Sequence, residues 1–159
     1  MAEHYRKVTV YEPYLASVIK KPSYISLEKA LEYHSLIPES VTVFTSLTTA
    51  RSGRFTSSAG TFEYRHIRES LFWGYNSVTV GGQTGFIASP EKALLDFFYF
   101  RRTGVTMEYI EELRLQNVKN IGLDKLFKYA ERFKKPGILR FAELLKKYID
   151  SYDKEENAL

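Results

Sequence analysis

Residues Ser77–Phe100 have the sequence SVTVGGQTGFIASPEKALLDFFYF, and this stretch decides the fold. Two runs that favour strands, Ser77–Val80 and Thr84–Ala88, flank Gly81-Gly82, and paired glycines adopt the positive φ angles of a tight hairpin turn. Ser89-Pro90 then supplies a helix N-cap followed by proline at the first helical position. The helix that follows is apolar nearly all round, which predicts a buried central helix.

The residues before this stretch alternate between strand and turn patterns. Val41–Thr49 is rich in β-branched residues and is predicted to be a strand. Arg54–Thr56 and Thr61–Ile67 are predicted to pair as a second hairpin. Val8–Ile19 is predicted to be extended. Ser26 is predicted to be the N-cap of a helix over Leu27–Ser35.

The residues after the central helix favour helices only. Apolar spacing predicts helices over Met107–Leu115, Asp124–Phe133 and Ile138–Tyr152, and residues 153–159 are expected to fray. Strands followed by helices indicate an α+β fold, with a small, mainly antiparallel sheet packed with helices and then a C-terminal helical segment.

Composition excludes several classes of protein. The chain of 159 residues fits one domain, and it has no cysteine, which excludes disulfides and thiolate metal sites. Its longest apolar run, Phe97–Phe100, is far shorter than the ~18 residues of a membrane span. No signal peptide is visible in residues 1–14, so we expect a cytoplasmic protein that does not enter a membrane.

The net charge of +4 and the pI of about 9.1 favour contact with a polyanion such as nucleic acid. Many basic domains are merely well solvated, so charge by itself leaves both interpretations open. The 12 tyrosines suit either a binding surface or a half-buried sheet.

Patterns for catalysis are weak. No glycine-rich phosphate loop and no nucleophile elbow occurs, and the three histidines are scattered. We therefore predict no catalytic residue, no metal site and no cofactor. Glu91, Lys92 and Asp96 superficially match a magnesium-dependent nuclease, but Glu91 and Lys92 point about 100° apart on a helix. The alternative hypothesis is nevertheless a metal-dependent nuclease or nucleotidyl-transfer enzyme that uses Glu91, Asp96 and a nearby base.

Basic side chains gather on the predicted hairpin around residue 60. We predict that they grip phosphates or an acidic protein surface, with tyrosines adding stacking, or else form a solvated face paired with Glu63 and Glu69. The candidate binding residues are Arg51, Arg54, Tyr64, Arg65, His66 and Arg68, with Tyr75 and Glu28 as further candidates.

A second basic set lies in the C-terminal helices. Three of its members recur at helical spacing and so share a face. This face is either solvated or a ridge that contacts phosphates. The set comprises Lys125, Lys128, Arg132, Lys134, Lys135, Arg140, Lys146 and Lys147.

Four motifs occur in order along the chain. Pro22–Glu39 matches the pattern P-S-Y-[IV]-S-L-E-x-A-L-x-Y-x-x-L-I-P-E, and Thr45–Thr49 matches T-S-[VL]-T-T. Gly60–Ile67 matches G-x-F-x-Y-R-H-[IL], and Ala88–Asp96 matches A-x-P-E-K-A-L-L-D. Together they resemble the AbiEi-like antitoxin family over about residues 14–99.

The resemblance implies the antitoxin of a bacterial type IV toxin–antitoxin or abortive-infection system. Such an antitoxin acts without catalysis: it neutralises a toxin that resembles a nucleotidyltransferase, and it represses its own operon by binding DNA. The implied partners are therefore DNA and this toxin, with which contact need not be direct. In this family an N-terminal winged helix binds DNA, and the C-terminal domain carries the antitoxin role and assists DNA binding.

The chain departs from the family pattern before its first motif. The family's winged helix normally begins some tens of residues earlier, whereas residues 1–21 have room only for the last wing strand, over Tyr5–Tyr11. We accordingly predict a remnant of the wing or a linker over residues 1–21, an antitoxin-like domain over 22–152 and a frayed tail over 153–159.

Overall fold

The computed structural model describes residues 10–158, with side chains described as far as Glu155. A six-stranded sheet has the strand order β3-β4-β2-β1-β6-β5. Three pairs are antiparallel (β1 with β2, β3 with β4, β5 with β6), and two are parallel (β2 with β4, β1 with β6). The strands are β1 Ser23–Ile25, β2 Val43–Thr48, β3 Gly53–Ser57, β4 Gly60–His66, β5 Tyr75–Val80 and β6 Gln83–Ala88.

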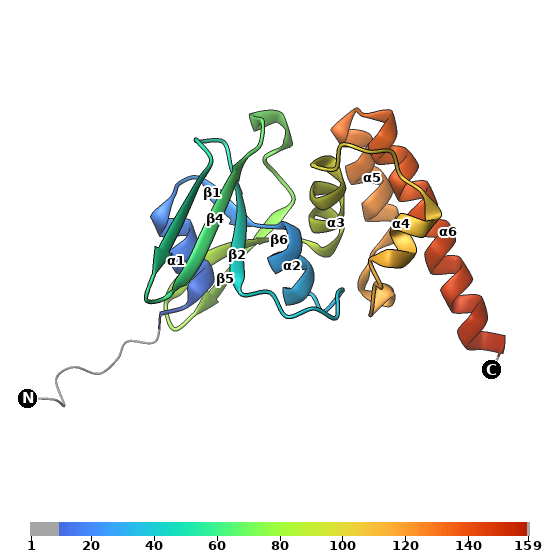
Figure 1. Cartoon of the computed structure of the whole chain (residues 1–159), viewed down its shortest axis with the longest axis horizontal. Coiled ribbons are helices and arrows are strands. Elements are labelled where there is room, and N and C mark those ends of the chain that lie inside the picture. The colour runs from blue at the N-terminus through green and yellow to red at the C-terminus, as the bar shows by residue number, and fades with distance from the viewer. Residues whose placement is uncertain (1–9, 159) are drawn as a thin grey trace, which may run out of the picture.

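Helices cover both faces of the sheet and extend beyond it (Figure 1). They are α1 Glu12–Ile19, α2 Leu27–Tyr33, α3 Pro90–Tyr99, α4 Met107–Glu112, α5 Leu123–Phe133 and α6 Pro136–Ala158, with 3₁₀ turns η2 Glu69–Leu71 and η3 Val118–Asn120. The predicted α+β class is confirmed, and the sheet is mixed.

Both predicted hairpins are present. The turn between β5 and β6 has Gly81 at φ 57° and Gly82 at φ 78°, as a tight primed turn requires. The second hairpin pairs β3 with β4, from Gly53 opposite Tyr64 to Ser57 opposite Gly60.

The prediction of an extended segment over Val8–Ile19 is wrong from Glu12 onward, where α1 forms; its first two residues lie outside the described part. Pro13 occupies the first turn, where proline is favoured, and is buried with Ala16. The helix packs against β6 so closely that a Cβ on Gly85 would lie 2.5 Å from the Pro13 carbonyl carbon. Burial against the sheet thus overrides the β-branched composition of this segment.

The two faces of the sheet are covered by different helices. On one face the Tyr64 hydroxyl donates a hydrogen bond to the Ala16 carbonyl oxygen in α1. On the other face the Thr45 hydroxyl donates to the Ser26 carbonyl oxygen beside α2. Helix α2 packs against α3, and α3 in turn contacts α5 and α6. The central helix therefore joins the sheet to the C-terminal helices.

The predicted central helix is confirmed. The Ser89 hydroxyl accepts a hydrogen bond from the Lys92 backbone N–H, and Pro90 is the first helical residue. Helix α3 is buried over Glu91–Asp96. The serine before α2, Ser26, makes no capping hydrogen bond with its side chain, because its hydroxyl bonds to α3 instead.

The three C-terminal helices pack on the far side of α3, where Phe98 and Phe141 stack with their ring centroids 4.6 Å apart. Helix α6 continues to Ala158, beyond the predicted end at Tyr152. The predicted wing strand over Tyr5–Tyr11 falls mostly on residues outside the described part. Within residues 10–158, no helix combines the length and hydropathy needed to span a bilayer.

Candidate functional site

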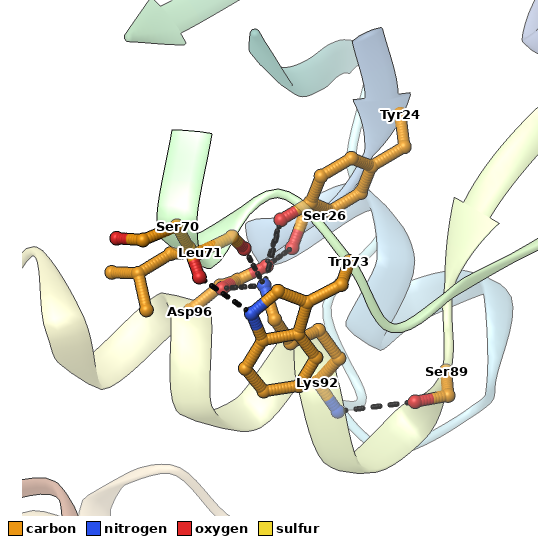
Figure 2. Close-up of polar contacts among 8 residues, drawn as sticks. All are labelled: Tyr24, Ser26, Ser70, Leu71, Trp73, Ser89, Lys92 and Asp96. Carbon is orange, nitrogen blue, oxygen red and sulfur yellow. Dashed lines mark hydrogen bonds and ion pairs between the residues drawn. The ribbon is translucent and has the colours of Figure 1, made fainter. Parts of the chain in front are cut away.

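Lys92 and Asp96, two residues of the suspected catalytic trio, form a buried ion pair (Figure 2). The Lys92 Nζ donates to Asp96 Oδ1 at 2.7 Å, to the Tyr24 hydroxyl at 2.8 Å and to the Leu71 carbonyl oxygen at 2.9 Å. Both side chains have no exposed surface. All three ammonium protons are thus used inside the protein.

The second oxygen of Asp96 is satisfied from strand β1 and the residue after it. Asp96 Oδ2 accepts from the Tyr24 hydroxyl at 2.9 Å and from the Ser26 hydroxyl at 2.8 Å. Burial raises the pKa of Asp96, and the ion pair with Lys92 opposes this shift. We call Tyr24, Ser26, Lys92 and Asp96 the buried network. Its hydrogen bonds are all internal, so it holds α3 against the sheet.

Glu91, the third residue of the trio, faces a different element. Its Oε2 accepts from the Gly122 backbone N–H at 2.8 Å, at the start of α5, and its Oε1 lies 3.5 Å from Lys125 Nζ. Glu91 therefore holds α5 to α3. Among residues 10–155, no three His, Asp or Glu side chains are grouped so that they could hold one metal ion.

The predicted basic cluster on the hairpin does not form one surface with its tyrosine. Arg54 forms an exposed ion pair with Glu63 at 2.9 Å, which is the solvated alternative raised from the sequence. His66 lies with Nδ1 3.0 Å from the Ala50 carbonyl oxygen, and Arg51 is exposed. Tyr64 is only 1% exposed, so its ring is not available for stacking on a ligand.

Burial raises the pKa of Tyr64 to about 12. Because the folded-state pKa lies above the unfolded value of about 10, its contribution to stability is complete below pH 10 and is lost as the pH rises towards 12. We expect the free energy of unfolding of the wild-type chain to fall on the order of 2 kcal/mol more than that of Tyr64→Phe over this range. Denaturant titrations at a series of pH values measure the difference, and parallel curves would contradict it.

Arg65 and Arg68, the remaining arginines of the hairpin cluster, line two different cavities. The guanidinium of Arg65 lies 4.2 Å above the Phe100 ring in a cavity of about 240 Å³ that Glu28 also lines. Burial raises the pKa of Glu28, and Arg65 opposes this shift. Arg68 instead lines a second cavity.

We call this second cavity the small cleft, which has a volume of about 300 Å³. It lies between η2 and the junction of α5 with α6, and none of its lining residues is acidic. Arg132 stacks at 4.0 Å from the Trp73 ring centroid, which holds its guanidinium in place. The charged residues that line the small cleft are Arg68, Arg132, Lys134 and Lys135.

A neighbouring cavity, the large cleft, has a volume of about 550 Å³ and also lacks an acidic lining residue. It lies between the end of α3, the following loop and the start of α6. Its four cationic residues are Arg101, Arg102, Lys135 and Arg140. Lys135 lines both clefts, and Arg101 lines both the large cleft and the Arg65 cavity.

The two clefts bring together seven exposed cationic side chains from three parts of the sequence, which we call the cationic band. In the part of the chain with described side chains, none of the seven forms an ion pair. The cationic band consists of Arg68, Arg101, Arg102, Arg132, Lys134, Lys135 and Arg140.

Only part of the second basic set from the sequence lies in the cationic band. Arg132, Lys134, Lys135 and Arg140 join the cationic band, whereas Lys125 pairs with Glu91 and Lys146 pairs with Asp150 at 3.0 Å. The sequence did not single out Arg101 and Arg102. Their position directly after the buried helix, next to Thr103-Gly104, is the signal that could have identified them.

The chain matches no protein-family model, and a search of curated proteins finds no significant match.

Proposed function

We propose that this chain is a non-catalytic binding domain whose ligand is nucleic acid. More particularly, we propose an antitoxin-like regulatory domain of a bacterial toxin–antitoxin or abortive-infection system. In that role it would contact DNA, neutralise a nucleotidyltransferase-like toxin and act in the cytoplasm.

The main observation in support of this proposal is the cationic band. Exposed cations without acidic partners are electrostatically costly to gather, and a phosphate backbone relieves their mutual repulsion and releases counterions. The residues that most resembled a catalytic site support the same proposal, because Lys92 and Asp96 bind each other and the hydroxyls of Tyr24 and Ser26 inside the protein.

The first and fourth sequence motifs meet in the structure. Tyr24 and Ser26 belong to the first motif, and Lys92 and Asp96 belong to the fourth. These four residues form the buried network, so this part of the resemblance rests on residues that bind one another. A gene for a nucleotidyltransferase-like protein next to this one would support the antitoxin role.

The proposal is tested by the salt dependence of binding. We expect a labelled 20-base-pair DNA to bind with an affinity whose logarithm falls linearly with the logarithm of salt concentration. Arg68→Ala should lower that slope by about 1, because one phosphate contact is lost. Fluorescence anisotropy at several salt concentrations measures both quantities.

Arg54→Ala is the matched control for Arg68→Ala. It removes an arginine that is also exposed but is already paired with Glu63, so we expect the slope to stay unchanged. Binding that is absent, or insensitive to salt, would overturn the proposal. So would hydrolysis or nucleotide transfer in the presence of Mg²⁺ that Glu91→Gln abolishes while the fold stays intact.

A further inference from the structure

The large cleft is lined by apolar as well as cationic side chains. Its apolar walls are formed by the partly exposed Tyr99 at the end of α3 and Val105 in the following loop, backed by the buried Phe98 and Ile138. The rim carries the cationic residues already described. An apolar, partly aromatic hollow inside a cationic rim suits a ligand that has one flat, apolar part and one negatively charged part.

A nucleotide has this combination. Bases stack on aromatic side chains irrespective of sequence, and cations alongside hold the backbone. The volume of about 550 Å³ lies within the range of ~300–1,000 Å³ that is typical of small-molecule sites. A base inside a duplex is stacked on its neighbours and paired, so it cannot enter such a hollow without being unstacked.

The small cleft supplies the place for the phosphate. It adjoins the large cleft through Lys135, whose Nζ lies 4.4 Å from the Tyr99 ring centroid. Lys135 thus lies between an aromatic wall on one side and Arg132 and Lys134 on the other. A base in the large cleft would have its phosphate near these three cations.

We infer that the two clefts together bind one unpaired nucleotide, with the base in the large cleft and the phosphate in the small cleft. This inference rests on the proposed function and narrows it from nucleic acid in general to an unpaired nucleotide. The nucleotide belongs either to a single strand or to a free mononucleotide, which share this chemistry.

Two glycines that line the large cleft have room for a larger side chain. They are Gly104 and Gly137, and a Cβ built on either would meet no heavy atom within 4 Å. Gly104→Trp and Gly137→Trp therefore place an indole at the cleft from two different elements. Val80→Trp is the matched control, because Val80 is 52% exposed at the β5–β6 hairpin and lines neither cleft.

The experiment compares four ligands by anisotropy and competition at one salt concentration: a labelled single strand, the same strand with abasic sites, the duplex and a mononucleotide. We expect the single strand to bind at least about fivefold more tightly than the abasic strand. Gly104→Trp and Gly137→Trp should remove that preference, and Val80→Trp should keep it. Competition by the mononucleotide supports the inference with a free nucleotide as the source, and its failure supports a strand.

Equal binding of the intact and abasic strands, unchanged by either cleft-filling variant, would overturn the inference. The proposed function would survive that result if salt-dependent binding of the duplex persisted. Absence of binding to every nucleic acid would overturn both. An acidic peptide that competes as well as the single strand would also overturn the inference, since it has charge but no base.

Discussion

Replacing Asp96 with alanine should lower the free energy of unfolding by about 3–5 kcal/mol, because the Lys92 ammonium would stay buried without a counter-charge. Lys92 Nζ has no exposed surface and lies 4.7 Å from the Trp73 ring centroid and 5.3 Å from that of Phe133. Aromatic faces attract a cation but do not replace a carboxylate at 2.7 Å. Urea denaturation, followed by the fluorescence of Trp73, the single tryptophan, measures the loss.

The double variant Lys92→Met/Asp96→Leu separates loss of the pair from loss of one partner. It removes both charges and keeps apolar volume, so its cost should be well below the sum of the two single variants. The hydroxyls of Tyr24 and Ser26 would still lose their acceptor, so we do not expect full recovery. Additive losses would contradict the ion pair, and an Asp96→Ala chain as stable as the wild type would contradict the buried network.

Local features were predictable from the sequence because local physics determines them. The cap at Ser89 involves a backbone N–H three residues away, and the glycine turn depends on two adjacent φ angles. Helix α1 was missed because its stability comes from packing on β6, which is some 70 positions later in the chain. The sequence predicts that Ser26 caps α2, but its hydroxyl donates to Asp96 instead. This partner lies 70 positions later in the chain, so the local pattern gives no sign of it.

In the candidate site, too, some features follow from the local sequence and others depend on residues far apart in the chain. Arg68 and the basic run Arg132–Lys135 were each predicted as part of a cationic group, but of two separate groups. Only the packing of α5 and α6 on α3 brings them to one cleft, and the same packing leaves Arg51 and Arg54 elsewhere. Residue type therefore predicted the chemistry of the surface, whereas its shape and position required the tertiary structure.

Reversing three charges of the small cleft should weaken nucleic-acid binding on the order of 10³-fold. Arg68, Lys134 and Lys135 are exposed, so replacing all three with glutamate leaves the core intact. Each charge-assisted hydrogen bond to a phosphate is worth about 1.5–3 kcal/mol, and three lost together give this factor at the lower limit. Anisotropy at low salt measures the affinity, and the salt slope should fall by about 3.

The informative control carries the same net charge with its glutamates placed elsewhere. Lys21, Arg51 and Lys147 are exposed and line neither cleft, so Lys21→Glu/Arg51→Glu/Lys147→Glu changes the overall field equally but leaves the cationic band whole. Long-range attraction weakens beyond the Debye length of about 10 Å at 0.1 M salt, so near that concentration the control should bind almost as well as the wild type. If both triple variants lost affinity equally, binding would follow net charge alone, and the clefts would have no special part in it.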